Sequence, residues 1–296
     1  MIIPKRRHFL KPSFPRVFSC GLMALMIKYP YLRMKKSMDT YSEQKSFGIW
    51  PEKSVPLLKF RSKTERRIPD PAPITLITGV NYPSLTSFLP KAAKGRARAV
   101  IVCPGGAYDV LAVDYEGYEI AEALAKAGIA AFVLKYRVPR QREAALCDAL
   151  RAVRYLRFHA EEFGVDPNSI GIMGFSAGGH LSAMCAGSSG KKVYAPIDEV
   201  DRVSARPDNL GLIYPAYLEE KPRFPLLKDH PPTFLLQASD DPYFPSYTAY
   251  EKELLKRKLP LEAHLFPEGG HGFGSRPCGK ATDDWLKLYM NWLKRI

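Results

Sequence analysis

Short apolar runs alternate with longer segments of helical periodicity along most of this chain. A continuous apolar run bounded by glycine or proline is typical of a buried strand, whereas apolar residues three and four positions apart are typical of an amphipathic helix. This pattern predicts strands at 97–103, 129–138, 169–174, 209–217, 232–240 and 261–266. It predicts helices at 115–128, 142–164, 180–187, 247–258 and 283–296.

The order of these elements indicates the class of fold. Apolar strands separated by amphipathic helices form βαβ units, which build a mostly parallel sheet covered by helices on both faces. Two earlier segments, 74–80 and 84–90, alternate apolar and polar residues around a short turn, so they predict an antiparallel N-terminal hairpin. The alternation is unbroken from about residue 96 onwards. We therefore expect one α/β domain, residues 46–296, preceded by a separate leader, residues 1–45.

The positive charge of the chain is concentrated in its first 38 residues. This stretch holds nine Lys or Arg residues and no Asp or Glu, while the net charge of the whole chain is +14. The rest of the chain therefore carries an ordinary net charge of +5. Dense positive charge is what indicates binding to nucleic acid or to an anionic membrane. We expect no nucleic-acid partner for the domain and confine that alternative to residues 1–38.

The leader contains an apolar run, residues 17–27, after a basic start, which is the order found in a signal peptide. No small-x-small cleavage site follows this run, and the run is too short to span a bilayer as a helix. We therefore expect no membrane span, and we interpret the leader as a disordered tail or as a start assigned upstream of Met34 or Met38. A cytoplasmic location is favoured, while export by an atypical signal and the oligomeric state stay open.

The five cysteines argue against a disulfide framework and against a structural zinc site. Their number is odd, their spacing is irregular and no Cys-x-x-Cys pair occurs. Four of them lie in or beside apolar runs, where a free cysteine behaves as a small hydrophobic residue.

Chemically active side chains gather in such sheets at the carboxyl ends of the strands. There the sequence Gly174-Phe175-Ser176-Ala177-Gly178 places a G-x-S-x-G pattern between a predicted strand and a predicted helix. In this context the pattern is a nucleophile elbow, a strained turn that exposes the serine hydroxyl while the glycines leave room for neighbouring backbone. Ser176 is therefore the candidate nucleophile. The alternative is a glycine-rich turn with an incidental serine.

A serine hydroxyl is a weak nucleophile that needs a base, and the base needs a carboxylate to orient it. His271 lies in a glycine-rich loop after the last predicted strand and is the candidate base. Asp240 and Asp241 both stand at the end of the preceding strand. We favour Asp241 as the acid because the Asp-Pro step begins the turn toward the next helix. Asp240 is the alternative, and one of the two would cap that helix.

The negative charge that develops on a substrate oxygen needs backbone N–H donors. The helix after Ser176 presents free amides at this point, and the amide of Ala177 is the first of them. The second donor is expected from the loop Cys-Pro-Gly-Gly-Ala-Tyr, at Gly105 or Gly106. These backbone groups are the candidate oxyanion hole.

Side chains that converge from the loops would set the substrate preference. The candidates, from their places beside the same strand ends, are Tyr108, Tyr115, Glu116, Tyr214 and Tyr243. An aromatic ring in such a place stacks on a sugar or fills the core, and core packing is the commoner case.

These motifs together resemble the α/β-hydrolase superfamily, and more narrowly its acetylxylan-esterase-like and feruloyl-esterase-like (BD-FAE-like) esterases. The resemblance covers about residues 48–296 and rests on segments such as VIVCPGGAY, FSAGGHLSA, PPTFLLQASDDPYFP and FPEGGHGFG. It implies a serine hydrolase without metal or cofactor, in which Ser176, Asp241 and His271 form the triad. It also implies short acyl groups, such as acetyl groups on xylan-derived or other plant-polysaccharide sugars.

Two segments depart from the pattern of that family. Ala107 replaces the usual third glycine of the oxyanion loop, which leaves the donor amides in place and narrows the pocket. The segment between LIYPAY and PPTF is shorter than in many relatives, which implies a more open cleft.

The leading hypothesis is a serine carboxylic-ester hydrolase that acts on a small-molecule or oligosaccharide ester through an acyl-enzyme. The same residues would serve a peptidase or an arylformamidase, and a panel of ester and amide substrates distinguishes these enzymes. The alternative of another class is a non-catalytic ligand-binding protein on a hydrolase scaffold. Such proteins usually lose the serine or the histidine, and this chain keeps both.

Overall fold

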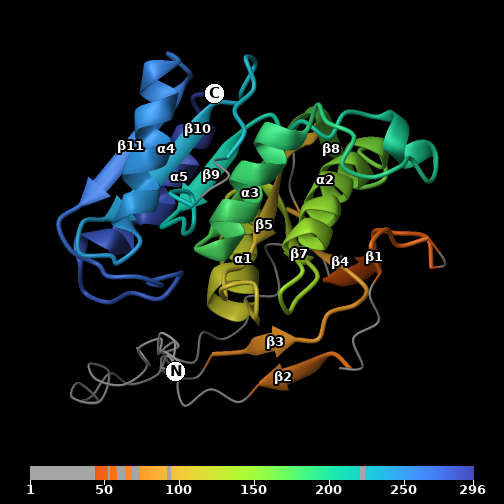
Figure 1. Ribbon diagram of the computed structural model, residues 1–296, viewed down its shortest axis with the longest axis horizontal. Helices are drawn as coiled ribbons and strands as arrows, with labels where there is room; N and C mark the ends of the chain where they lie inside the picture. Colours follow the sequence, from red (N-terminus) through yellow and green to blue (C-terminus); the bar gives the residue numbers. More distant parts are fainter. Residues whose placement is uncertain (1–43, 53, 59–63, 69–73, 92–94, 221–223) are drawn as a thin grey trace, which may run out of the picture. The chain divides into compact units, whose positions relative to one another are not determined.

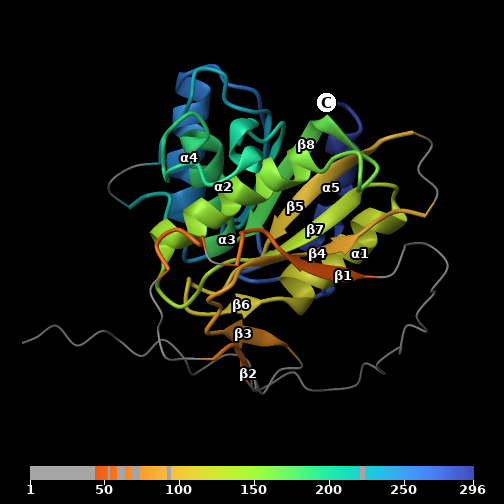
Figure 2. The ribbon, with the colours of Figure 1, turned by 90° about the vertical axis from the view of Figure 1, so that its right-hand side faces the viewer.

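Within the part of the chain that the structure describes, eight strands form a central sheet (Figures 1 and 2). The computed structural model describes residues 44–296 except 53, 59–63, 69–73, 92–94 and 221–223. The strands of this sheet are, in spatial order, β1 (Lys45–Gly48), β4 (Ser84–Phe88), β7 (Ala130–Lys135), β5 (Ala97–Cys103), β8 (Val165–Phe175), β9 (Leu210–Ile213), β10 (Thr233–Ala238) and β11 (Leu261–Phe266). From β7 to β11 neighbouring strands are parallel, and β4 and β1 add an antiparallel edge.

Helices cover both faces of the sheet, as the view in Figure 2 shows. The described helices are α1 (Glu119–Lys126), α2 (Arg142–Phe158), α3 (Ala177–Ser188), α4 (Phe244–Lys256) and α5 (Trp285–Leu293). Helices α2, α3 and α4 lie on one face, and α1 and α5 lie on the other. Ile172 and Met173 are consecutive in β8 and are buried in different core clusters, one on each face. A strand that is buried on both sides needs apolar residues at every position, which explains the continuous apolar runs.

The predicted fold class, a mostly parallel sheet with helices on both faces, is confirmed. The predicted strands at 97–103 and 261–266 coincide with β5 and β11. Helix α2 ends at Phe158, earlier than the predicted 164, and turns connect it to Gly164, which has a φ of 64°. Left-handed backbone of this kind favours glycine and cannot continue a helix.

The predicted N-terminal hairpin is wrong, because its two strands belong to different sheets. The first strand, β3 (Leu76–Thr78), pairs with β2 (Arg66–Ile68) and β6 (Leu111–Ala112) in a separate antiparallel sheet. The second, β4, pairs with β1 and β7 in the main sheet. A tight hairpin turn needs positive φ angles that proline at position 83 cannot adopt. Alternation of apolar residues predicts a strand but does not say which strand is its partner.

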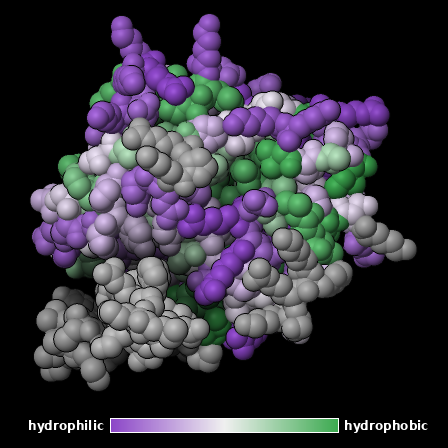
Figure 3. Space-filling view, in the orientation of Figure 1, coloured by the Kyte–Doolittle hydropathy of each residue, from purple (hydrophilic) through white to green (hydrophobic). Residues whose placement is uncertain are grey.

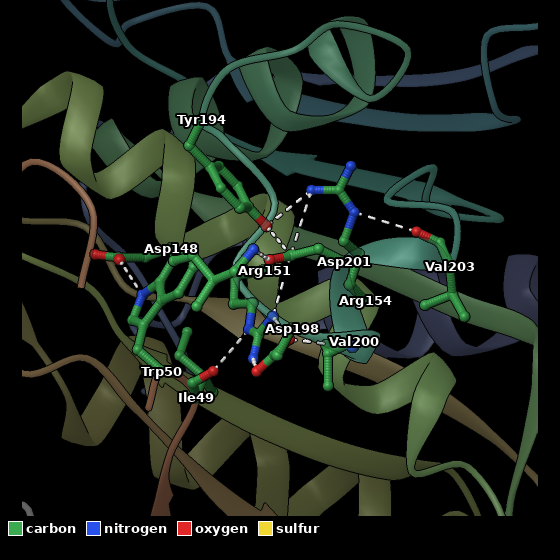
Figure 4. A network of polar contacts seen from close by, with 11 residues as sticks. Ile49, Trp50, Asp148, Arg151, Arg154, Tyr194, Asp198, Val200, Asp201 and Val203 are labelled. Atoms are coloured by element: carbon green, nitrogen blue, oxygen red, sulfur yellow. Dashed lines mark hydrogen bonds and ion pairs between the residues drawn. The ribbon is translucent and has the colours of Figure 1, made fainter. Parts of the chain in front are cut away.

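A polar network holds the segment after β1 against α2 (Figure 4). The guanidinium of Arg151, a buried residue of α2, donates to the carbonyl of Ile49 at 2.8 Å and to both carboxylate oxygens of Asp198 at 2.6 Å. Beside it the indole N–H of Trp50 donates to Asp148 at 2.8 Å. These contacts fix the segment after β1 beside α2. Leu57, which follows in the chain, lines a cleft at the start of α2.

The expectations for the leader stay predictions, because residues 1–43 lie outside the described residues. This includes the basic stretch 1–38 and its possible contact with nucleic acid or a membrane surface. None of the described helices is long and apolar enough to cross a membrane. On the face of the molecule drawn in Figure 3, hydrophilic and hydrophobic residues are interspersed.

Candidate active site

Ser176 lies in a strained turn between β8 and α3. Its backbone has φ 51° and ψ −119°, a conformation that costs a residue with a side chain about 1–3 kcal/mol. Backbone hydrogen bonds hold it there: its N–H donates to the carbonyl of Ile213, and its carbonyl accepts the N–H groups of His180 and Ala216. The end of β9 therefore enforces the turn, and the structure gives Ser176 the elbow geometry that the sequence predicted.

The two glycines of the elbow are required by close backbone contacts. A Cβ at Gly174 would lie 2.1 Å from the carbonyl oxygen of Gly178. A Cβ at Gly178 would lie 2.1 Å from the carbonyl oxygen of Cys103, at the end of β5. The first turn of α3 therefore packs directly on strand backbone, as expected from the sequence.

The structure brings Ser176, His271 and Asp241 into one line of hydrogen bonds. The Nε2 atom of His271 is 2.8 Å from the Ser176 hydroxyl oxygen, although the two residues are 95 positions apart. The Nδ1 atom of His271 is 2.7 Å from a carboxylate oxygen of Asp241. The side chain of Asp241 is fully buried, while that of His271 is 25% exposed. A base held in this way can receive the serine proton and return it to a leaving group.

The two adjacent aspartates have different places. Asp241 contacts His271 with one carboxylate oxygen and accepts the N–H of Tyr243 with the other, at 2.7 Å. Asp240 accepts the N–H of Gly270 at 2.8 Å, and this hydrogen bond holds the pKa of its carboxyl below the usual range. Asp241 therefore orients the imidazole directly, whereas Asp240 supports the backbone of the histidine loop.

The loop after β5 has one amide that is already bonded. The N–H of Gly105 donates to the carboxylate of Glu116 at 2.8 Å, so this amide is occupied. The next two amides, of Gly106 and Ala107, have no acceptor among the described residues. Their backbone turns sharply, with φ values of 128° and 56°. Of the two glycines predicted as donors, Gly106 is the one whose amide is left for a ligand.

The N-terminus of α3 supplies the opposite side of this site. Ala177 is the first residue of α3, so its N–H has no intrahelical partner. The helix dipole adds partial positive charge at the same place. Together with the free amides of the β5 loop, the Ala177 amide can stabilise an oxyanion that forms on a carbonyl attacked by Ser176.

Glu116 and Tyr214, which were candidates for the substrate pocket, lie beneath the site. Both are buried, and the hydroxyl of Tyr214 donates to Glu116 at 2.7 Å. The N–H of Gly274, in the histidine loop, donates in turn to the Tyr214 hydroxyl at 2.9 Å. Burial raises the pKa of the Glu116 carboxyl. Through these hydrogen bonds Glu116 and Tyr214 connect the loop after β5 to the histidine loop.

Tyr108, another of the pocket candidates, contributes to the walls of two clefts beside the site. Its hydroxyl lies 2.7 Å from Nδ1 of His180, in the first turn of α3. Burial lowers the pKa of His180 to about 4, so its imidazole is neutral near pH 7 and accepts this hydrogen bond. His180 therefore has a packing role beside Tyr108.

Arg142 and Tyr217 belong to a series of ring contacts that leads to His271, and the sequence predicts neither of them. Arg142, at the start of α2, has its guanidinium carbon 4.6 Å from the ring centroid of Tyr217. Tyr217 packs against Tyr243 with ring centroids 5.6 Å apart, and Tyr243 packs against His271 at 4.7 Å. No motif or spacing marks Arg142 or Tyr217, because only the fold brings α2 and the loop after β9 together.

Cys103 is buried at the end of β5, next to the elbow. Burial raises the pKa of its thiol to about 12, so it stays protonated and unreactive at neutral pH. Among the described residues, no group of three or more His, Cys, Asp or Glu side chains is placed to hold a metal ion. The Cys103 thiol is therefore not a competing candidate for the nucleophile of this site.

The chain resembles known esterases in both sequence and structure. The family model described as BD-FAE matches residues 85–207. A solved acetyl ester-xyloside bifunctional hydrolase from Caldicellulosiruptor lactoaceticus is 31% identical over 85% of this chain and 96% of that chain, with a TM-score of 0.71. Esterase 2 of Thermogutta terrifontis, solved with propionate, is 23% identical over 72% of this chain and 89% of that chain, with a TM-score of 0.64, a likeness that shows the fold alone.

Two curated relatives are longer proteins. An acetylxylan esterase of Xylanibacter ruminicola is 32% identical over 232 residues, which are 72% of this chain and 48% of that protein. An endo-1,4-beta-xylanase B of Butyrivibrio fibrisolvens is 31% identical over 206 residues, which are 58% of this chain and 32% of that protein. This chain therefore spans half or less of the length of these two relatives.

Proposed function

Because this chain belongs to the BD-FAE family of α/β-hydrolases, we propose that it is a serine carboxylic-ester hydrolase that cleaves short-chain esters. The observation that carries the proposal is the contact of His271 with both Ser176, at 2.8 Å, and Asp241, at 2.7 Å. A serine hydroxyl in a strained elbow, a base within reach and a buried carboxylate behind the base are the parts that acyl transfer requires.

The reaction starts when the Ser176 hydroxyl oxygen attacks the carbonyl carbon of the ester. His271 takes the hydroxyl proton on Nε2, and Asp241 stabilises the imidazolium through the Nδ1–H hydrogen bond. The tetrahedral intermediate collapses, the bond to the alkoxy oxygen breaks, and His271 returns the proton to the leaving alcohol. Water, deprotonated by His271, then hydrolyses the acyl-serine, which releases the carboxylic acid and restores the hydroxyl.

The oxyanion of each tetrahedral intermediate lies between two backbone segments. The Ala177 amide donates from the start of α3, and the Gly106 amide donates from the loop after β5. The amide of Ala107 is a further donor of the same loop. Donors that are in place before the reaction stabilise the developing charge without the cost of reorganising solvent, and each is worth about 3–4 kcal/mol.

The substrate proposed is an acetyl ester of a sugar, with xylan-derived oligosaccharides as the first to test. This rests on the relatives, two of which are called an acetylxylan esterase and an acetyl ester-xyloside hydrolase. The second of these is matched over 96% of its length.

The proposal is tested by hydrolysis of p-nitrophenyl acetate by the wild type and by Ser176→Ala. We expect activity in the wild type and a loss of about 10³-fold or more in kcat for the variant. Circular dichroism of both proteins shows whether the variant is folded. A panel of ester and amide substrates separates an esterase from a peptidase or an arylformamidase. An inert wild type, or an equally active variant, would refute the proposal.

A further inference from the structure

A cleft of about 490 Å³ begins at the oxyanion loop and runs along the start of α2. The cleft is lined by Ala107, Tyr108 and Asp109 of the loop after β5, by Leu57 and by residues 140–144. A neighbouring cleft of about 290 Å³ shares Tyr108 and Arg142 and extends toward Glu220. The side chain of Arg142 therefore contributes to both spaces, which we call together the Arg142 cleft.

The lining of the Arg142 cleft includes one buried side-chain donor that has no partner among the described residues. Gln141 is 9% exposed, and its Nε2 atom is buried without an acceptor among the described residues. Gln141 is also the N-cap of α2, where the first amides have no intrahelical acceptor, and its side chain does not supply one. Buried polar groups are normally hydrogen-bonded. Such a surface matches a ligand that offers oxygen acceptors.

Arg142 is held in place before any ligand arrives. Its guanidinium lies over the rings of Tyr217, at 4.6 Å, and Tyr108, at 5.1 Å. It also forms an ion pair with Glu220 at 2.7 Å. A side chain that is already ordered loses less conformational entropy on binding, which favours a hydrogen-bonding role for its free N–H groups.

The charges of the cleft favour a neutral ligand over an anion. Arg140 pairs with Asp109 at 3.0 Å, and Arg142 pairs with Glu220 at 2.7 Å. Glu143 adds a further carboxylate to the lining. Each guanidinium charge is therefore already balanced by a carboxylate. Together these planar side chains offer both donors and acceptors, which suits the hydroxyl groups of a sugar.

A line of aromatic rings joins the cleft to the reaction centre. Tyr217 lies under Arg142, Tyr243 packs against Tyr217, and His271 packs against Tyr243. Tyr217 and Tyr243 are partly exposed. A tyrosine has an apolar ring face and a polar hydroxyl. A sugar ring likewise has an apolar C–H face and hydroxyl groups at its edge, so the two surfaces match.

We propose that the Arg142 cleft is the sugar-binding subsite of this protein and that it holds the oligosaccharide whose ester is cleaved at Ser176. The proposal rests on the proposed function for the identity of the reacting group. Binding of the unesterified sugar can be measured without catalysis, and this makes the two proposals separable.

The first test is calorimetric titration of xylotriose into the full chain carrying Ser176→Ala. We expect saturable binding, and a Kd raised about tenfold or more when Arg142→Ala or Gln141→Leu is added, because each change removes donors to the ligand. Arg202→Ala is the matched control, because Arg202 is an exposed arginine that is paired with Glu199 at 2.9 Å and does not line the cleft. The control should leave the Kd unchanged, and thermal unfolding shows that each variant is folded.

The second test uses proteins that keep Ser176. It compares the hydrolysis of acetylated xylo-oligosaccharide with that of p-nitrophenyl acetate. Arg142→Ala should lower kcat/KM for the sugar ester, relative to kcat/KM for p-nitrophenyl acetate, by about tenfold or more. The loss should come mainly from a higher KM for the sugar ester. Absence of saturable xylotriose binding, or an unchanged Kd in both cleft variants, would overturn the subsite. A wild-type protein that hydrolyses neither ester would overturn the proposed function. The xylotriose titration would then by itself decide whether the Arg142 cleft binds sugar.

Discussion

The carboxylate of Glu116 accepts a hydrogen bond from the backbone amide of Gly105, at a distance of 2.8 Å. This contact ties a fully buried acid to the loop that supplies the oxyanion donors. The other oxygen of Glu116 accepts the hydroxyl of Tyr214, which in turn accepts the amide of Gly274 in the histidine loop. One carboxylate thus connects the two loops that flank Ser176.

Replacement of Glu116 should therefore weaken both the fold and the reaction. Glu116→Ala leaves the Gly105 and Tyr214 donors buried without an acceptor, which costs about 1–3 kcal/mol for each group. Glu116→Gln keeps an acceptor for one of them. We expect the alanine variant to lose more in Tm and in kcat for p-nitrophenyl acetate than the glutamine variant. Equal losses in the two variants would show that the hydrogen bonds of Glu116 do not account for its effect on Tm and kcat.

The two adjacent aspartates should differ in their effect on catalysis. Asp241→Asn removes the carboxylate that orients His271, and the comparable change in serine hydrolases lowers kcat by about 10⁴-fold. Asp240→Asn alters only a hydrogen bond at an exposed position of the histidine loop. We expect the Asp240 variant to lose far less. The kcat values of both variants, measured beside the wild type, check this, and a larger loss at Asp240 would contradict the contacts described above.

A methyl group at Gly178 should disrupt the elbow. Its Cβ would lie 2.1 Å from the Cys103 carbonyl oxygen, which is backbone and cannot move aside freely. We expect Gly178→Ala to destabilise the protein by about 1–3 kcal/mol or more and to abolish most activity. Gly190→Ala is the control, because nothing lies within 4 Å of a Cβ placed there. Denaturant unfolding of the two variants should separate them clearly, and similar stabilities would contradict the packing of α3 on β5.

The half-buried His180 makes stability depend on pH. Its pKa falls from 6.5 to about 4 on folding because burial disfavours the charged form. Above pH 6.5 both the folded and the unfolded states are neutral at this residue, so the contribution to stability is fully present. As the pH falls toward 4 the unfolded state takes up the proton first, and up to about 3 kcal/mol is lost.

The comparison that tests this uses His180→Gln, which cannot titrate but can accept the Tyr108 hydroxyl. The free energy of unfolding of the variant, relative to the wild type, should rise as the pH is lowered from 6.5 to 4. His230 is buried with a similarly lowered pKa, but it is present in both proteins and its contribution cancels. A difference that stays constant over this pH range would show that His180 is not the group responsible.

The sequence by itself determined the class of fold and the local chemistry of the elbow. The apolar runs at 97–103 and 261–266 became β5 and β11, because a strand covered on both faces leaves an unbroken apolar signature. The elbow was readable for a similar reason. Ser176 has glycines two positions before and after it, and the contacts that demand them arise within one strand, one turn and one helix.

Only the tertiary structure decided which residues meet. Asp240 and Asp241 are neighbours in sequence, and only the position of His271 distinguishes them. The sequence makes Gly105 and Gly106 equal candidates for the oxyanion donor, and the hydrogen bond from the Gly105 amide to Glu116 distinguishes them.

The same holds for the strands before residue 90, which were expected to pair with each other, and for Arg142 and Tyr217, which carry no motif. Periodicity and turn chemistry are properties of short segments and can be read from the chain. Pairing across a sheet and convergence of loops depend on distances in space between segments far apart in sequence, and those distances are set by the packing of the whole fold.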